Sequence, residues 1–296
     1  MLFMVQDTLE KTKETVWPEI RKYLEDPTYP SQFRIPKDYK KEVDLYWKIN
    51  RDYPERKGKY LRPTLVLLTS RAMGTRASQA LSTAAAMQLS EEWILIHDDI
   101  EDNSETRRGK PTLHKLHGAE LAINAGDAVN TIMWKVINDL SSKEISDEFY
   151  RILMHTVLGQ AVEQIWTNNK IKDITDKKYL FIADSKSAYY SIAGPMRLGA
   201  IVAGATSTQI DKITNFGLYL GRCFQLVDDI LDIEQDKKEG KITLANTKGK
   251  KYTINLAKKM KDLARNIFDK ELGFLSHEPA RTELKELINF ILEREY

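Results

Sequence analysis

Three long stretches of this 296-residue chain contain no proline: residues 64–110, 112–194 and 196–278. Apolar residues recur through them at the three- and four-residue spacing of a helix face, and β-branched residues form no alternating runs. The sequence therefore predicts an all-α protein without strands. Helices are expected over residues 5–24, 39–50, 59–73, 77–103, 118–140, 146–168, 176–204, 208–236, 252–271 and 280–294.

Within the expected helix 176–204, Gly194 is followed by Pro195. Proline lacks an amide hydrogen and clashes with the preceding turn, so this pair predicts a kink. No linker and no shift in composition divides the chain elsewhere. A single all-helical domain over residues 1–296 is therefore expected.

Hydrophobic residues make up 42% of the chain and charged residues 30%, a mixture typical of soluble globular proteins. The net charge is +2 and the basic runs are short, which argues against nucleic-acid binding. No apolar stretch reaches the roughly 20 residues that span a bilayer, and the polar start is unlike a secretory signal. With a single cysteine, Cys223, these features predict a cytoplasmic protein without an integral membrane segment.

Two aspartate-rich clusters of nearly the same design lie far apart: Asp98-Asp99-Ile100-Glu101-Asp102 and Asp228-Asp229-Ile230-Leu231-Asp232. Each lies in an expected helix, so its first and last aspartates share one helix face. Carboxylates stacked in this way repel one another unless a cation lies between them, and oxygen ligands without nearby Cys or His suit Mg²⁺ better than zinc. Two clusters able to face each other across a bundle predict a site for Mg²⁺ and a diphosphate.

Acidic runs on helices are most often solvated faces, and both aspartate clusters could be such faces. Each cluster, however, ends an apolar stretch typical of a core: residues 93–96 precede the first and residues 223–227 precede the second. Carboxylates that emerge from a core are costly unless they are paired or bound to metal. This position favours a binding site over a solvated surface.

Several ordered motifs between about Gly58 and Lys250 resemble those of the trans-isoprenyl diphosphate synthases, also called polyprenyl synthetases. The two clusters match the family's DDxxD motifs, residues 58–63 (Gly-Lys-Tyr-Leu-Arg-Pro) its GKxxRP motif, and residues 107–111 (Arg-Arg-Gly-Lys-Pro) its RRGxP motif. The resemblance implies an isoprenoid synthase fold, an antiparallel bundle of helices around a deep central cavity, usually in a homodimer. It also implies Mg²⁺-dependent condensation of isopentenyl diphosphate with an allylic diphosphate.

The resemblance also gives the individual residues roles in binding. The aspartates of both clusters would bind Mg²⁺, with Asp228 as the main ligand of the second cluster and Asp229 and Asp232 acting through water or other groups. Isopentenyl diphosphate would be bound by three cationic side chains: Lys59, Arg62 and Arg108. Two cations one turn apart near the start of a helix suit phosphate, although exposed Lys and Arg alone would be unremarkable.

The allylic diphosphate would contact Arg107 and the Lys186-Ser187 pair, which resembles the family's KT motif. Gln225, just before the second cluster, would orient the allylic group or its pyrophosphate. The resemblance therefore implies three catalytic residues: Lys186, Gln225 and Arg107. Lys241 and Lys250 resemble basic residues of a loop that closes over the diphosphate. Tyr189 and Tyr190 either line the cavity or belong to the core.

Glu91 departs from the family pattern, which usually has His or Gln at this position as a donor to isopentenyl diphosphate. A carboxylate there should repel a diphosphate unless it is protonated or paired with Lys59, Arg62 or another cation.

A second departure follows Lys241, where Leu244-Ala245 replaces the usual Thr-Asp pair. The loop is expected to close differently, or Asp236 or Glu239 compensates.

Product length should follow cavity depth, and Trp93 lies five residues before Asp98, about 7.5 Å along a helix. Bulky aromatic residues at this position accompany short products in the family. Trp93 and the adjacent Ile94 therefore predict geranylgeranyl diphosphate in preference to farnesyl diphosphate or longer chains. Alternatively, Trp93 only packs against a neighbouring helix.

Two other functions are open besides farnesyl diphosphate synthesis. A class I terpene cyclase shares the fold, but its second metal motif is of the Asn/Ser/Glu type. A non-catalytic subunit of a heteromeric synthase tends to lose aspartates, whereas both clusters are complete here. His114 and His117 are three residues apart but lack further ligands, so no zinc site is expected.

Overall fold

The structure is a computed structural model that describes residues 2–25, 32, 34–169, 171 and 174–292. The chain divides into two compact units, each made of separate stretches of sequence. Unit 1 comprises Met1–Thr8, Thr64–Ala80 and Ser142–Tyr296, and unit 2 comprises Leu9–Pro63 and Leu81–Ser141. Neither unit is a continuous segment, and the expected single domain over residues 1–296 stays a prediction.

Most helices of unit 1 follow one another in the second half of the chain. They are α7 (Lys143–Asn168), α8 (Asp176–Ile182), the π-helix η2 (Ala183–Ala193), α9 (Gly194–Val202), α10 (Ser207–Leu231), α11 (Ile233–Glu239), α12 (Leu244–Thr247), α13 (Lys250–Glu271) and α14 (Ala280–Leu292). Most of α3 (Leu61–Ala72) also belongs to this unit.

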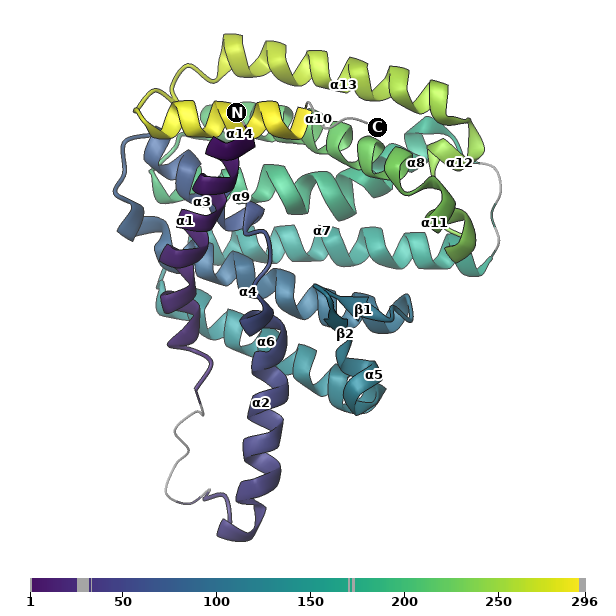
Figure 1. Ribbon diagram of the computed structural model, residues 1–296. Coiled ribbons are helices and arrows are strands. Elements are labelled where there is room, and N and C mark those ends of the chain that lie inside the picture. Colours follow the sequence, from purple (N-terminus) through teal and green to yellow (C-terminus); the bar gives the residue numbers. More distant parts are fainter. Residues whose placement is uncertain (1, 26–31, 33, 170, 172–173, 293–296) are drawn as a thin grey trace. The chain divides into compact units, whose positions relative to one another are not determined.

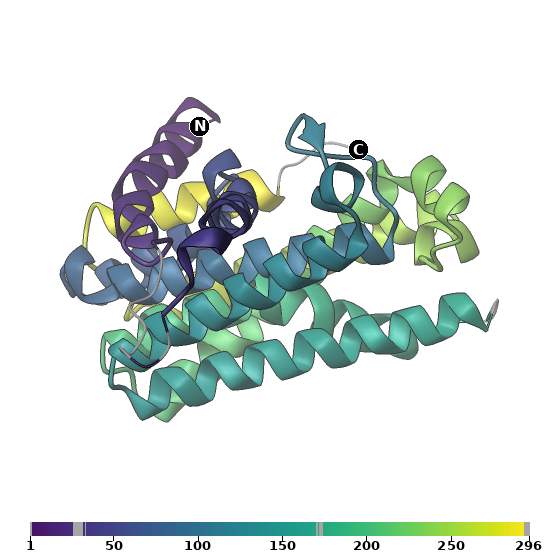
Figure 2. The same cartoon turned by 90° about the horizontal axis from the view of Figure 1, so that it is seen from below.

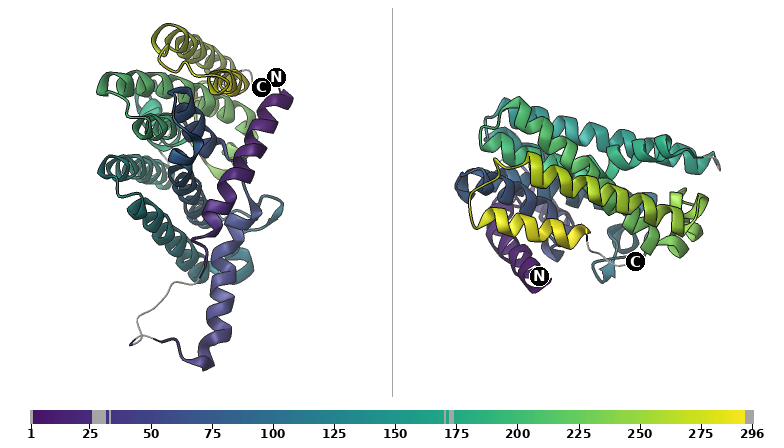
Figure 3. Two further views of the ribbon diagram at one scale, coloured as in Figure 1. Left: turned by 90° about the vertical axis from the view of Figure 1, so that its left-hand side faces the viewer. Right: turned by 90° about the horizontal axis from the view of Figure 1, so that it is seen from above.

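Helix α10 is the centre of unit 1. It packs on one side against η2 and α9, which in turn pack on α7, and on the other side against α13 (Figure 1). Helix α14, yellow in the right-hand view of Figure 3, also contacts α10. The rings of Phe216 and Phe268 join α10 to α13 with their centres 5.6 Å apart. Apolar side chains therefore lie on two sides of α10, and both sides are buried.

Two glycines allow α10 to approach η2 closely. A Cβ atom at Gly217 would lie 2.5 Å from the Cα of Ala193, and one at Gly221 would lie 2.4 Å from the Cα of Ala188. Real side chains do not tolerate such distances, so glycine on one helix and alanine on the other set the spacing. This contact packs the helix that carries the second aspartate cluster closely against η2.

The expected helix 176–204 is continuous but irregular. It begins as α8, widens into the π-helix η2, and returns to α geometry at Gly194. Pro195 lies in the first turn of α9, where its missing amide hydrogen costs least. The departure from α geometry is thus the π-helix, which spans Ala183–Ala193 and ends just before Gly194-Pro195, and the kink at this pair stays a prediction.

Unit 2 holds most of α1 (Leu2–Arg21) and α4 (Ala77–Glu101). It also contains the 3-10 helix η1 (Lys37–Tyr39), α2 (Lys40–Arg56), the strands β1 (Thr106–Arg107) and β2 (Lys110–Pro111), α5 (Leu113–His117) and α6 (Ala119–Asp139). A hydrogen bond of 3.0 Å from Tyr46 Oη to the carbonyl of Asn124 joins α2 to α6.

The prediction that the chain contains no strands is wrong at one place. Strands β1 and β2 form an antiparallel hairpin in which Arg107 pairs with Lys110. The turn residues Arg108 and Gly109 have φ angles of +52° and +75°, as in a two-residue type I′ turn. Strands of two residues give no alternating pattern, so the sequence offered only the glycine as a clue.

The all-α prediction is otherwise confirmed, because these two short strands are the only ones in the part of the chain that the structure describes. The longest helices match the predicted ranges well, and α7 runs without interruption (Figure 2). None of the described helices combines the length and the apolar character that crossing a bilayer requires.

Candidate active site

The first aspartate cluster lies at the carboxyl end of α4 in unit 2. The amide of Asp102 still donates to the carbonyl of Asp98 at 2.9 Å, so these two residues stay on one helical turn. Both side chains are half-buried, whereas Asp99 is fully buried. Carboxylates at this end of a helix face the negative end of its dipole, so a cation is needed to stabilise them.

Asp99 points into unit 2. Tyr53 Oη of α2 donates to it at 2.5 Å, and Arg107 donates from both Nε (3.1 Å) and Nη2 (2.5 Å). Burial and the adjacent carboxylate raise the pKa of Tyr53, so its hydroxyl stays protonated as a donor. Asp98 Oδ2 lies 3.9 Å from Arg107 Nη2. Asp99 therefore fixes Arg107 beside the more exposed Asp98.

The hairpin turn directs the next arginine toward α4. Arg108 Nη1 donates to Glu92 Oε2 at 2.8 Å and Nη2 donates to Glu92 Oε1 at 3.2 Å. A Cβ atom at Gly58 would lie 2.6 Å from Arg108 Nη2. The glycine of the GKxxRP motif thus leaves room for the arginine of the RRGxP motif.

Glu91 lies next to the same guanidinium group. Its Oε2 is 3.2 Å from Arg62 Nη1 and its Oε1 is 3.9 Å from Arg108 Nη2. The predicted pairing with Arg62 is therefore present, and Arg108 is the further cation. Lys59 is exposed.

Glu92 is fully buried and was not among the predicted site residues. Besides Arg108, Gln88 Nε2 donates to it at 2.6 Å. Burial raises the pKa of Glu92 to about 7, although Arg108 opposes the rise. The clue in the sequence was a second glutamate next to Glu91 in an apolar helix, because a buried carboxylate requires a cation.

Trp93 and Ile94 are both half-buried on α4. The Trp93 ring packs edge-on against His97, with centres 5.7 Å apart, and His97 Nε2 lies 3.5 Å from Asp127 Oδ1 of α6. The Trp93 Nε1 atom is buried and has no hydrogen-bond partner among the described residues.

The second aspartate cluster lies at the carboxyl end of α10 in unit 1, and its middle aspartate is again held by a tyrosine. Asp229 is buried and accepts hydrogen bonds from Tyr179 Oη and, at 2.7 Å, from Gln225 Nε2. Burial raises the pKa of Asp229 to about 7. Asp228 is half-buried and Asp232 is exposed, so these two offer oxygen atoms to a ligand.

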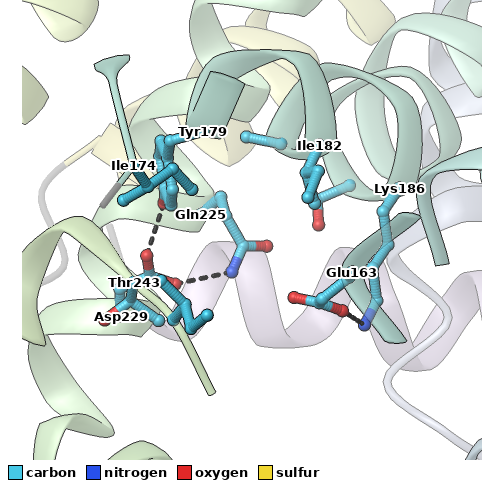
Figure 4. A pocket seen from close by; sticks show the side chains of 11 residues that line it. Glu163, Ile174, Tyr179, Ile182, Lys186, Gln225, Asp229 and Thr243 are labelled. Carbon is cyan, nitrogen blue, oxygen red and sulfur yellow. Dashed lines mark hydrogen bonds and ion pairs between the residues drawn. The ribbon is translucent and has the colours of Figure 1, made fainter. Parts of the chain in front are cut away.

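Lys186 of η2 forms an ion pair of 2.6 Å with Glu163 of α7. A pocket of about 50 Å³ lies beside this pair and is also lined by Tyr179, Gln225 and Asp229 (Figure 4). Residues from three predicted motifs, Ser187 included, thus meet at one place in unit 1.

The family model of the polyprenyl synthetases matches residues 44–291. This chain belongs to the polyprenyl synthetase family. A geranylgeranyl diphosphate synthase of Sulfolobus acidocaldarius is 34% identical over 227 residues, which cover 73% of this chain and 68% of that protein. A farnesyl diphosphate synthase of Geobacillus stearothermophilus is 30% identical over 246 residues, covering 80% and 78% of the two chains.

Among solved structures, a geranylgeranyl pyrophosphate synthetase of the archaeon Geoglobus acetivorans superposes with a TM-score of 0.81. It shares 23% sequence identity, and the match covers 98% of this chain and 99% of that one. The isoprenoid synthase fold predicted from the motifs is therefore confirmed, and the chain is a short-chain prenyltransferase.

The loop of this synthase beyond the second cluster differs from the family pattern in a defined way. Leu244 and Ala245 are buried in the short helix α12, so an apolar anchor replaces the polar pair. Asp236 is buried and its carbonyl accepts the amide of Lys241 at 2.9 Å. Lys250 begins α13 and is exposed. Glu239 was the other residue expected to compensate for the missing Thr-Asp pair, and its side chain lies outside the described residues.

Tyr189 belongs to the core of the synthase. Its hydroxyl donates to Glu148 at 2.9 Å, and Arg197 binds the same carboxylate at 2.6 and 2.7 Å. All three side chains are largely buried, and these contacts hold the pKa of Glu148 below its usual value despite burial. Of the two readings of this tyrosine, packing is the one that the contacts favour.

Proposed function

We propose that this synthase condenses isopentenyl diphosphate with an allylic diphosphate in a Mg²⁺-dependent reaction, and that geranylgeranyl diphosphate is its main product. The repeated arrangement of the two aspartate clusters carries the proposal. Each cluster ends a helix, each has a buried middle aspartate bound to a tyrosine, and each has cationic side chains nearby. Such a design suits a ligand that is itself a polyanion with divalent cations.

The oxygen atoms of Asp98, Asp102 and Asp228, with Asp232 acting through water, fit the preference of Mg²⁺ for carboxylates. No group of three or more acidic, His or Cys side chains in the described parts of the chain is arranged to hold an ion alone. Mg²⁺ commonly binds through one or two carboxylates together with substrate phosphates and water. When bound, the ions would neutralise charge on the departing pyrophosphate.

The chain's own residues would do the remaining work. Lys186 and Arg107 would bind the allylic diphosphate and stabilise negative charge as the C–O bond breaks. Gln225, held by Asp229, would orient the allylic group. Arg62, Arg108 and the exposed Lys59 would bind isopentenyl diphosphate, and Lys241 and Lys250 would approach the diphosphate from the loop.

Asp99 and Asp229 act in this scheme as positioning residues. Asp99 holds Arg107, and Asp229 holds Gln225, while the paired tyrosines orient both carboxylates. Formation of the new C–C bond leaves a carbocation, which then loses a proton. We assign the uptake of this proton to the departing pyrophosphate. The scheme therefore needs no protein base.

Product length would be set by Trp93 and Ile94 on the helix that carries the first cluster. The relatives include synthases named for geranylgeranyl and for farnesyl diphosphate, so both products are within reach of the family. The bulk of Trp93 supports a short product over long polyprenyl chains.

We also propose a homodimer, assembled through α7, working in the cytoplasm. Five large apolar residues on one side of α7 are exposed: Tyr150, Met154, Val157, Leu158 and Ile165. Their spacing places them on a common face, and an exposed apolar stripe of this kind marks an interaction surface. A two-fold axis would bring identical stripes together.

Product analysis tests the proposed function directly. Purified protein is incubated with labelled isopentenyl diphosphate and each of dimethylallyl, geranyl and farnesyl diphosphate, with and without Mg²⁺. Mg²⁺-dependent geranylgeranyl diphosphate is the expected product. A hydrocarbon released from an allylic diphosphate alone would instead indicate a cyclase, and inactivity of the purified chain would indicate a subunit that needs a partner.

A further inference from the structure

The carboxylate of Glu91 lies between the two arginines that the proposed function assigns to isopentenyl diphosphate. Its oxygen atoms are 3.2 Å from Arg62 Nη1 and 3.9 Å from Arg108 Nη2. A phosphate group bound by both arginines would need the same space between them, because guanidinium groups bind carboxylate and phosphate with similar geometry. Glu91 thus fills the anion site with a group of the chain itself.

Carboxylates already neutralise much of the positive charge at this site without a ligand. Arg62 and Arg108 contribute two positive charges, and Glu91 and the ionised form of Glu92 contribute two negative charges. An incoming diphosphate therefore meets two cations that already have carboxylate partners. Binding must break at least one of these ion pairs or add the substrate's negative charge to a cluster whose positive charge is already largely neutralised.

The two glutamates differ in their freedom to move. Glu92 is fully buried and accepts hydrogen bonds from Arg108 and Gln88, so its displacement would leave buried polar groups unpaired. The Glu91 side chain is 15% exposed and its contacts are the two arginines. Glu91 is the carboxylate that can turn toward solvent.

We propose that Glu91 is an internal competitor of isopentenyl diphosphate: its carboxylate occupies the phosphate position between Arg62 and Arg108 and is displaced when this substrate binds. The inference rests on the proposed function and adds a determinant of affinity for one substrate only. The allylic diphosphate is assigned to other cations: Arg107, which pairs with Asp99, and Lys186, which pairs with Glu163. Glu91 acts as a specificity-determining residue, not as a catalyst.

The test is the substitution Glu91→Gln, which keeps the size of the side chain and removes its charge. The KM for isopentenyl diphosphate should fall ~10-fold, because the neutral amide no longer competes as an anion for Arg62 and Arg108. The KM for the allylic substrate should stay within twofold of the unmodified enzyme. Glu55→Gln is the matched control, because Glu55 is an exposed glutamate of the same unit whose carboxylate lies 4.0 Å from Arg51.

Direct binding of isopentenyl diphosphate, measured by calorimetry without the allylic substrate, separates affinity from turnover. Glu91→Ala is the second variant if Glu91→Gln does not fold, and melting temperatures of both are compared with the unmodified chain. An unchanged or weaker affinity for isopentenyl diphosphate in a folded variant would overturn the inference. If the unmodified enzyme forms no condensation product at all, the proposed function fails instead.

Discussion

Tyr53 donates a hydrogen bond of 2.5 Å to the buried carboxylate of Asp99. In the other unit Tyr179 donates to Asp229 in the same way. Each aspartate is the second of its cluster, and each in turn holds a polar side chain of the proposed site, Arg107 in one case and Gln225 in the other. The two clusters therefore share a supporting design as well as a sequence motif.

Removing one tyrosine hydroxyl should reduce turnover without unfolding the protein. In Tyr179→Phe, Asp229 loses a donor, Gln225 becomes less well oriented, and kcat should fall about tenfold, as expected for one hydrogen bond to a charged group. Steady-state kinetics check this result. Tyr46→Phe is the control, because Tyr46 donates to the carbonyl of Asn124 in unit 2 and not to an aspartate of either cluster; an equal loss of kcat there would contradict a local effect.

Metal removal should abolish activity and leave the fold intact. The described residues form no metal site of their own, so EDTA should not lower the melting temperature, and added Mg²⁺ should restore product formation. Asp98→Asn should weaken the apparent affinity for Mg²⁺ by at least ~10-fold, since even groups that only support metal ligands change affinity by that much. Asp44→Asn, which alters an exposed ion pair with Lys40, should leave it unchanged. Unfolding by EDTA would show that the metal is structural.

The raised pKa of Glu92 predicts how stability depends on pH. Between about 4.5, the ordinary value, and about 7, the value in the folded protein, the folded chain keeps a proton that the unfolded chain has lost. The free energy of unfolding should therefore contain a contribution that decreases as pH rises through this range. In Glu92→Gln this contribution should vanish, which urea unfolding from pH 4.5 to 8 can measure. A pH profile identical to that of the unmodified chain would refute the assignment.

Shortening the side chain at position 93 should lengthen the product. In Trp93→Ala the loss of the indole would open space about 7.5 Å from Asp98 along the helix, enough for further condensation cycles, and Ile94→Ala should act in the same direction with a smaller effect. Chromatography of the dephosphorylated products gives the distribution. An active Trp93→Ala enzyme with the original products would show that Trp93 only packs against its neighbours, such as His97.

A charge in the apolar stripe of α7 should prevent dimer formation. Leu158 is 50% exposed, and burying a glutamate at this position against a second copy would be costly. Leu158→Glu should therefore run as a monomer in analytical ultracentrifugation, whereas Leu45→Glu, at an equally exposed leucine of α2, should not change the mass. A dimer that survives Leu158→Glu would place the interface elsewhere.

Sequence patterns predicted the long helices because apolar spacing is a local property, and they predicted the clusters because DDxxD lies within one helix turn. They could not predict partners that come from distant segments, such as Tyr53 for Asp99 or Tyr179 for Asp229. The burial of Glu92 was equally hidden, since adjacent glutamates look alike until the packing of α4 is known. The hairpin was missed because its conformation depends on two residues with positive φ.

The π-helix also makes the site sensitive to chain length. Lys186 reaches Glu163 from a widened turn, and deleting one residue between Tyr179 and Lys186 would turn the ammonium group about the helix axis and away from Glu163. A deletion alone could thus remove the contact between Lys186 and Glu163, with every functional amino acid still present. For this segment, the number of residues between Tyr179 and Lys186 decides whether the ion pair forms, as their identity does.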